Sequence, residues 1–576
     1  MSASQSYLSS PQFGYDLVVA TTQGSINAAL QEFLSSGSEP EVVVCYVADS
    51  DGNPTPIDYQ TLVANANGSD PFSVPPNADP NTDTDLQNLF KARFLAGFKA
   101  QIGVPPGYVP ADAPPETPPK PTIPDLVVLG ADVSSVTFNL LCSEFIVVQY
   151  TPSSGYSPAQ WLSMSQPDGN AWIFSSTVDL HLVQGQPPYS NLPLAIQNQI
   201  LNLGGTAFSV QQLLFDLDNA KLQTMPTISG VPSGSPLDTL LTTYFLDEYF
   251  NTMQQNGQPL LGCTITVGTS GSSVPAPSIT PSNLTFETCP LLDSNGQPIV
   301  ANSNQDGQAP TQSQLDACTL NYLCAAGGDS LPPAVPFDWN WVEENEQSQF
   351  DGVMAINRNA FVNYLRSKLD GYVAQNCLQP HVDVNLDKVG WSMSNGTPTV
   401  TTPASGAIVL SYSYQADDEH SSALDANKMK LATNYSLVVT LSGSSMTVDQ
   451  HLQIFVYIRE GVSSDGGNVV DKEINELYTL GVDGNGNLTA AVVSTPTDNS
   501  KTPGVNGFLN FFTDLNDLTE DVADWARNVS DYTLRDLPLN IVQSYVFPGG
   551  KTFLFNDASF SNNQDLVAHI TYLDPS

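Results

Sequence analysis

Apolar and polar residues alternate over long stretches in the second half of the chain. The stretches lie at 408–414, 435–441 and 446–458, and a Ser442-Gly443-Ser444 turn separates the last two. Alternation gives a strand one apolar and one solvated face, which is typical of antiparallel sheets. The pattern predicts strands of about 8–13 residues, longer than the usual 5–6. Their apolar positions are Ile408, Leu410, Tyr412, Tyr414, Tyr435, Leu437, Val439, Leu441, Met446, Val448, Leu452, Ile454, Val456 and Ile458.

A cover for these apolar faces is indicated at 506–527. Apolar residues recur there at the spacing of one helix face, and acidic residues occupy the opposite face. We therefore expect a long amphipathic helix that lies in the concave face of a curved sheet. Its apolar positions are Phe508, Phe511, Phe512, Leu515, Leu518, Val522 and Trp525.

A short pattern near the N-terminus returns 335 residues later. The segment 15–34 and the segment 350–369 share Asp16/Asp351, Val18/Val353, Ala20/Ala355, Leu30/Leu365 and Leu34/Leu369. Each reads as a short strand followed by an amphipathic helix. A repeat of this kind predicts two related modules, since a missed repeat misassigns the whole fold. The alternative is that any strand followed by a helix gives this much similarity.

The remaining pattern is that of a mixed but strand-rich chain. Strands are expected at 41–48, 126–130, 134–140, 144–151, 171–184, 261–268, 540–546, 551–556 and 566–573. Helices are expected at 192–203 and 235–249, and residues 85–103 read as helical or mixed. Ser235 is a good N-cap, with Pro236 at the first helical position. The proline-rich residues 104–124 read as a stiff extended connection.

The fold class is therefore α+β and β-dominated. We expect a first module over residues 1–335, with the proline-rich insertion at about 104–124, and a second over 336–576. The boundary is placed just before Phe337, at the end of an irregular stretch rich in Ser, Pro, Asn and Gly.

A family resemblance is carried by three parts of the chain: the opening residues Phe13-Gly14-Tyr15-Asp16-Leu17-Val18-Val19-Ala20, the helix that ends near Leu34, and the closing Phe547-Pro548-Gly549-Gly550 with Phe553. These parts look like clostridial P47/OrfX-type proteins of the tubular lipid-binding (TULIP) superfamily. The sharp match covers about the first 35 residues, and the middle of the chain matches only in style.

The resemblance implies two barrel-like modules, each with a long twisted antiparallel sheet wrapped around a long helix. It also implies an apolar tube for a lipid or acyl chain, and an accessory role associated with toxin gene clusters. The ligand-binding residues would be Phe508, Phe511, Phe512, Leu515, Leu518 and Trp525, facing Leu437, Val439, Leu452 and Ile454. The alternative is a filled core, which would leave a structural or protein-interaction module.

Charge narrows the range of partners. The chain has 58 acidic and 17 basic residues and a formal net charge of −41. Such a polyanion repels phosphate backbones, so we expect no nucleic-acid partner. An apolar small molecule or a protein are the partners that remain.

No cofactor or metal is expected from the sequence. Among the seven cysteines, Cys45 and Cys142 lie in apolar strand-like runs and read as core thiols, and Cys318 and Cys324 lack partners at zinc-like spacing. The run Asp483–Asn487 departs from a calcium loop at two positions and is better read as a hairpin turn. His451 alternates with Asp449 and Gln453, which predicts a solvated face.

A reaction is not expected either. Glu343, Glu344 and Glu346 follow Trp339 and Trp341, and carboxylates beside aromatics would suit a carbohydrate-active hydrolase. A polar loop with tryptophan anchors is the favoured interpretation, because no nucleophile, phosphate-loop or metalloprotease motif accompanies them. Residues 1–14 lack the apolar core of a signal peptide, and no run of about 18 apolar residues exists. We therefore expect no transmembrane segment, and either a cytoplasmic location or release by a non-classical route.

Overall fold

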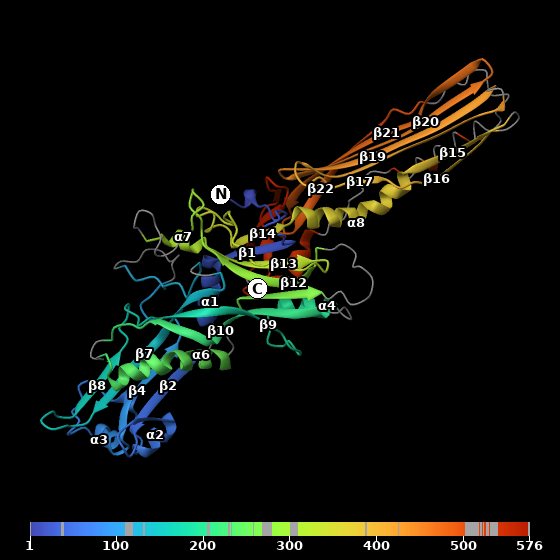
Figure 1. Ribbon diagram of the computed structural model, residues 1–576. Coiled ribbons are helices and arrows are strands. Elements are labelled where there is room, and N and C mark those ends of the chain that lie inside the picture. The colour runs from blue at the N-terminus through green and yellow to red at the C-terminus, as the bar shows by residue number, and fades with distance from the viewer. Residues whose placement is uncertain are drawn as a thin grey trace.

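The computed structural model shows an elongated, β-dominated molecule built from several antiparallel sheets (Figure 1). Both termini lie near its middle, and a sheet-containing arm extends to either side. Within the described part of the chain, no helix has the length and apolarity needed to cross a membrane. The structure describes residues 2–35, 40–109, 119–130, 133–203, 208–228, 231, 233–256, 259–267, 279–299, 309–385, 389–423, 426–501, 518, 521, 524–525, 529 and 539–573.

The middle of the molecule is an antiparallel sheet that takes strands from both ends of the chain. Its order is β12-β13-β1-β14-β26-β24, and β25 pairs with β26. The sequence therefore brings strands more than 500 residues apart into one sheet. The bounds are β1 Leu17–Thr22, β12 Pro281–Cys289, β13 Thr319–Ala326, β14 Gly352–Ile356, β24 Phe553–Phe555, β25 Ser559–Phe560 and β26 Leu566–Tyr572.

The two segments that share the repeated pattern lie side by side at the centre of this sheet. β1 and β14 are antiparallel neighbours, and Val19 is opposite Met354, its counterpart in the other segment. Asp16 Oδ2 accepts a hydrogen bond from the backbone of Ala326 at 2.8 Å. Asp351 Oδ2 accepts one from the backbone of Tyr572 at 2.6 Å. The pairing thus has an approximate two-fold axis that passes between Val19 and Met354.

A helix follows each of these two strands and buries equivalent residues. α1 (Gln23–Ser35) follows β1, and α8 (Arg358–Asn376) follows β14. Thr22 caps α1 by accepting from the backbone of Ser25 at 3.2 Å, and Asn357 caps α8 by accepting from Asn359 at 2.7 Å. The buried apolar residues are Ile26, Leu30 and Leu34 in α1 and Phe361, Leu365 and Leu369 in α8.

One arm consists of two sheets from the first half of the chain. The five-stranded sheet has the order β3-β2-β4-β7-β8, and the six-stranded sheet has the order β23-β11-β10-β9-β6-β5. β23 comes from the C-terminal end of the chain and pairs with β11. The bounds are β2 Glu41–Ala48, β3 Pro54–Ile57, β4 Phe94–Ile102, β5 Val127–Val128, β6 Ser135–Leu140, β7 Cys142–Thr151, β8 Gln160–Ser165, β9 Phe174–Gln184, β10 Phe208–Thr224, β11 Gly262–Val267 and β23 Val546–Pro548.

A helix fills the core of this arm. α5 (Pro236–Leu240) continues through a π-helical turn, Leu241–Phe245, into α6 (Leu246–Gln255), and Ser235 caps it as expected. The ring of Phe245 lies 5.5 Å from that of Phe98, 4.8 Å from Phe145 and 4.3 Å from Phe174. The remaining helices are α2 Tyr59–Asn65, α3 Thr84–Lys91, α4 Leu194–Leu203 and α7 Gln312–Asp316, with a 3₁₀ turn at Leu539–Ser544.

The other arm is a six-stranded sheet of long strands with the order β17-β18-β19-β20-β21-β22. α8 runs beside this sheet, and the β15–β16 pair lies further along it (Figure 1). The bounds are β15 Leu378–Val384, β16 Val389–Asn395, β17 Thr399–Thr401, β18 Ile408–Ser421, β19 Asn427–Ser442, β20 Ser445–Glu460, β21 Ser463–Val482 and β22 Leu488–Asp498.

Several sequence expectations are confirmed and others are wrong. The α+β, β-dominated class is confirmed, β2 has the predicted bounds, and Asp483–Asn487 forms the turn between β21 and β22. The strand expected at 540–546 is wrong, because Leu539–Ser544 is a 3₁₀ turn. The long strands β10 and β21 were missed. Most of the helix expected at 506–527 lies outside the described residues, and the module boundary near 335 remains a prediction.

Candidate functional site

The inner face of the long sheet is mainly apolar, although the buried polar residues Thr433, Gln450 and Glu476 also lie on it. Burial alternates along β19 almost without interruption, as the polar and apolar pattern predicts. Leu437 and Val439 on β19, and Leu452 and Ile454 on β20, have no solvent-exposed area. These four predicted ligand-binding residues therefore share one buried face.

Six of the ten predicted ligand-binding residues fall within the described structure. Besides the four strand residues, Leu518 is 4% exposed and belongs to the same apolar cluster, and Trp525 packs against that cluster. The other four, Phe508, Phe511, Phe512 and Leu515, lie outside the described residues. Whether any of the ten contacts a ligand remains a prediction.

The inner face is covered by separate pieces rather than by one element. α8 buries Phe361, Leu365 and Leu369 in the same cluster. Three hydrogen bonds join α8 to the sheet. Tyr372 Oη donates to Gln450 Oε1 at 2.7 Å, Tyr412 Oη donates to Asp370 Oδ1 at 2.6 Å, and Arg358 Nη2 donates to the backbone oxygen of Ile408 at 3.2 Å. Burial, together with Asp370, raises the pKa of Tyr412 well above its ordinary value, so this hydroxyl stays protonated.

Another piece of the cover, which contains Leu518 and Trp525, is attached to the β15–β16 pair at an exposed position. Trp391 Nε1, on β16, donates a hydrogen bond to Asp521 Oδ2 at 3.0 Å. Asp521 lies between Leu518 and Trp525 in the sequence, so this bond attaches that part of the chain to the β15–β16 pair.

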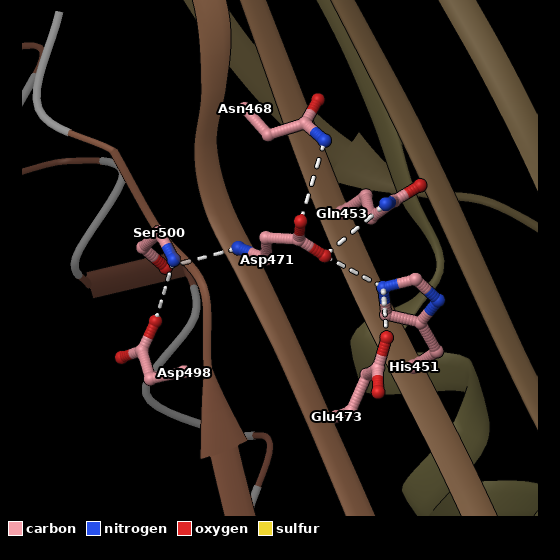
Figure 2. Close-up of polar contacts among 7 residues, drawn as sticks. All are labelled: His451, Gln453, Asn468, Asp471, Glu473, Asp498 and Ser500. Carbon is pink, nitrogen blue, oxygen red and sulfur yellow. Dashed lines mark hydrogen bonds and ion pairs between the residues drawn. The ribbon is translucent and has the colours of Figure 1, made fainter.

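The outer face of the same sheet carries a polar cluster that the sequence analysis did not identify. His451, Asp471 and Glu473 point toward one another from β20 and β21 (Figure 2). His451 Nε2 lies 2.7 Å from Asp471 Oδ1 and 3.7 Å from Glu473 Oε1. The prediction that His451 lies on a solvated face fits its partial exposure. The cluster itself was missed because β21 was not recognised as a strand, so the pairing of Glu473 with His451 could not be inferred.

The acidic residues near the tryptophans form no comparable site. Trp339 and Trp341 are 3% and 2% exposed, and both pack against Phe337. Glu344 accepts hydrogen bonds from Ser313 Oγ at 2.7 Å and Gln314 Nε2 at 3.3 Å. The tryptophans therefore serve as core residues and offer no ring face to a sugar.

All seven cysteines are buried as free thiols. Cys45 and Cys142 are each 1% exposed, which confirms the prediction of core thiols. Burial raises the pKa of the Cys45 thiol to about 12 and that of the Cys318 thiol to about 11. Thiols with such raised pKa values are poor nucleophiles and poor metal ligands at neutral pH.

Comparison with known proteins gives structural likenesses only. No protein-family model matches the chain, and no curated protein matches it. The crystal structure of P47 of Clostridium botulinum E1 matches with a TM-score of 0.42 and 9% sequence identity, over 96% of this chain and 98% of that one. A lipopolysaccharide binding protein matches with a TM-score of 0.26 and 12% identity, over 97% and 99%. At TM-scores this low, neither likeness establishes a fold or a function for this chain.

Proposed function

We propose that this chain is a non-enzymatic binding protein that holds an apolar ligand, such as the acyl chain of a lipid, against the inner face of the long sheet. The observation that carries the proposal is a long, mainly apolar face on β19 and β20 with a cover made of separate pieces. Each methylene group buried there would contribute about 0.8 kcal/mol. The proposal includes the TULIP-like arrangement of two modules, with a boundary near residue 335.

The lengths of the elements support this proposal. β19 and β20 each have 16 residues, which span about 50 Å at about 3.3 Å per residue. α8 has 19 residues and spans about 28 Å at about 1.5 Å per residue. The helix alone therefore covers about half of the apolar face. The rest falls to the β15–β16 pair and to the piece that contains Leu518 and Trp525.

The ligand enters, in this proposal, by displacing that third piece. Leu437, Val439, Leu452 and Ile454 are fully buried without a ligand, so an acyl chain needs a covering group to move. α8 is a continuous helix of 19 residues, and the partly buried hydroxyls of Tyr372 and Tyr412 connect it to the sheet. The piece with Leu518 and Trp525 is held at Asp521 by a bond to Trp391 at an exposed position. In this proposal, that exposed hydrogen bond opens when the ligand enters.

The first arm is a poor place for a ligand. Its helix is packed directly on aromatic rings, since Phe245 contacts Phe98, Phe145 and Phe174. Filling of this kind leaves no room for an acyl chain unless the core is rebuilt. We therefore assign binding to the second arm alone, and we assign no reaction to either.

Replacement of Trp391 by Phe tests the proposed entry route. Loss of one exposed hydrogen bond costs about 0.5–1.5 kcal/mol, which shifts a closed–open equilibrium by about two- to tenfold. The Trp391→Phe variant should therefore bind a fluorescent fatty acid about two- to tenfold more tightly than the parent chain, as measured by equilibrium titration.

The matched control is Trp161→Phe, on the edge strand β8 of the first arm. Trp161 Nε1 is buried without a hydrogen-bond partner among the described residues, so this change removes an indole but no hydrogen bond. Its affinity for the fatty acid should equal that of the parent chain. If neither the parent nor Trp391→Phe takes up the probe, the inner face is a filled core and the function lies on the outer surface.

A further inference from the structure

We propose that His451, Asp471 and Glu473 form a binding site for a zinc-class divalent cation on the outer face of the long sheet. The hairpin register brings them together. His451 is directly opposite Glu473, and Gln453 is directly opposite Asp471. Because side chains two residues apart share a face of a strand, all four lie on the same side of the sheet. One ligand atom from each of the three metal-binding residues lies within 4.8 Å of the others.

The donor set determines the class of ion. An imidazole nitrogen with two carboxylate oxygens suits zinc and related transition metals, whereas calcium and magnesium prefer oxygen ligands alone. Ligand atoms about 2.0–2.2 Å from one zinc ion are about 3.3–3.5 Å apart in a tetrahedral site. His451 Nε2 is 2.7 Å from Asp471 Oδ1 and 3.7 Å from Glu473 Oε1, so small side-chain adjustments suffice.

The central ligand, Asp471, is already held in place by neighbours. Gln453 Nε2 donates to Asp471 Oδ1 at 3.1 Å, and Asn468 Nδ2 donates to Asp471 Oδ2 at 3.5 Å (Figure 2). The backbone of Asp471 donates to Ser500 Oγ at 2.9 Å. Hydrogen bonds of this kind orient the ligands of metal sites and strengthen metal binding.

An irregularity in β21 places one of these neighbours. The pairing with β20 shifts between Ile454, opposite Val470, and Phe455, opposite Asn468. A bulge at this point turns the chain locally, so Asn468 reaches Asp471 three residues further on.

Other histidine–carboxylate pairs in the described structure lack this convergence. His420 Nε2 lies 3.3 Å from Asp418 Oδ1, and among the described residues no second carboxylate joins this pair in a cluster that could hold a metal ion. His569 has two carboxylate neighbours, but Asp557 lies 2.8 Å from Nδ1 and Glu346 lies 3.9 Å from Nε2. The two nitrogens point in different directions, so one ion cannot bind both carboxylates and the ring. Only the His451 cluster directs three ligand atoms to one point among the residues described.

The proposal is tested by titrating the metal-stripped full-length chain with Zn²⁺ in an excess of Mg²⁺. The excess occupies the weak sites that a chain of net charge −41 offers to any dication. We expect one equivalent of Zn²⁺ to bind in this background by isothermal titration calorimetry. His451→Ala and Glu473→Gln should each weaken that binding by about 10–100-fold or more.

The matched control is His420→Ala, which removes a histidine paired with a carboxylate on the same sheet. Its Zn²⁺ affinity should equal that of the parent chain. Circular dichroism of each variant checks that the outer-face changes leave the fold intact. The proposal is overturned if Mg²⁺ abolishes all Zn²⁺ binding by the parent chain, or if His451→Ala binds Zn²⁺ as tightly as the parent does.

Discussion

At the scale of single residues, three carboxyl groups at the central sheet have raised pKa values. Glu287 and Asp565 are fully buried, and Asp16 is half-buried. Burial raises the pKa of Asp16 to about 6, that of Asp565 to about 6 and that of Glu287 to about 7. The desolvation cost of burying Asp565 is offset by the hydrogen bonds that its carboxylate accepts from Ser6 Oγ, the backbone of Leu8 and the backbone of Arg358. These bonds connect the N-terminus, α8 and the C-terminal strands.

Glu287 is the least compensated of the three. It has no exposed area, its Oε1 accepts from Cys289 Sγ at 3.3 Å and Asn321 Nδ2 at 3.4 Å, and its Oε2 has no hydrogen-bond partner among the described residues. A carboxyl whose folded-state pKa exceeds its unfolded value lowers the free energy of unfolding between those two pKa values, because the unfolded chain ionises first. For Glu287 the loss grows as the pH rises from 4.5 to about 7 and is constant at higher pH.

We expect Glu287→Gln to stabilise the protein at about pH 8 and to have little effect at about pH 4.5. The rise of the pKa from 4.5 to about 7 corresponds to about 3 kcal/mol at most when the group is fully ionised. The measurement is urea unfolding of parent and variant across this pH range.

The control for this prediction is Glu248→Gln, at an exposed position in the first turn of α6. Its stability difference from the parent chain should be the same at pH values of about 6 and 8. A Glu287→Gln variant whose stability difference does not grow with pH would show that the carboxyl is not strained by ionisation.

At the scale of secondary-structure elements, the close contact between β1 and β14 depends on a glycine. A Cβ atom added at Gly352 would lie only 2.0 Å from the backbone oxygen of Ala20. Gly371, in α8, has open space around the equivalent added atom. A side chain at position 352 would therefore clash with β1, whereas one at position 371 meets no obstacle. The two positions lie only 19 residues apart.

We expect Gly352→Ala to destabilise the chain by about 2–4 kcal/mol, because the strands must separate to admit a methyl group. Gly371→Ala should instead stabilise it by about 0.5–1 kcal/mol, the usual gain in a helix interior. Both values come from denaturant unfolding. Equal effects of the two substitutions would contradict the tight β1–β14 pairing.

The elements that the sequence predicted well are those with a clear periodicity. β19 and β20 alternate between apolar and polar residues, β2 is a continuous apolar run, and the helix after Ser235 has a cap and an apolar face. β21 was missed because Asp465, Gly466 and Gly467 interrupt its pattern, although pairing with β20 keeps these residues in the strand. β10 was missed for a similar reason, since Asp216, Asp218 and Asn219 occupy exposed or half-buried positions on it. Both segments form strands because they pair with neighbouring strands, although their own residues have low strand propensity.

The candidate sites were predictable to different degrees for the same reason. The buried face with Leu437 and Ile454 follows from alternation within each strand. The cluster of His451 with Asp471 and Glu473 depends on which residue of β21 stands opposite which residue of β20. Register of that kind comes from the hairpin and its bulge, which no single strand pattern reveals.

At the scale of the whole molecule, the two arms meet at a sheet with an approximate two-fold arrangement. In the order β12-β13-β1-β14-β26-β24, two strands follow on either side of the central β1–β14 pair: β13 and β12 beside β1, and β26 and β24 beside β14. Asp16 and Asp351 occupy matching positions, as their hydrogen bonds to Ala326 and Tyr572 show. The arms themselves differ, since one has an aromatic-filled core and the other a long apolar face with a divided cover. That difference is why we place the ligand in one arm only.

Native mass spectrometry of the gently purified full-length chain, followed by extraction and identification of any bound small molecule, distinguishes a ligand-binding face from a filled core. If the long sheet holds a ligand, we expect a stoichiometric apolar adduct, or one that forms on incubation with mixed lipids, and greater occupancy in Trp391→Phe than in Trp161→Phe. A mass equal to that of the chain alone, unchanged after the same incubation in all three proteins, would show that the inner face is a filled core.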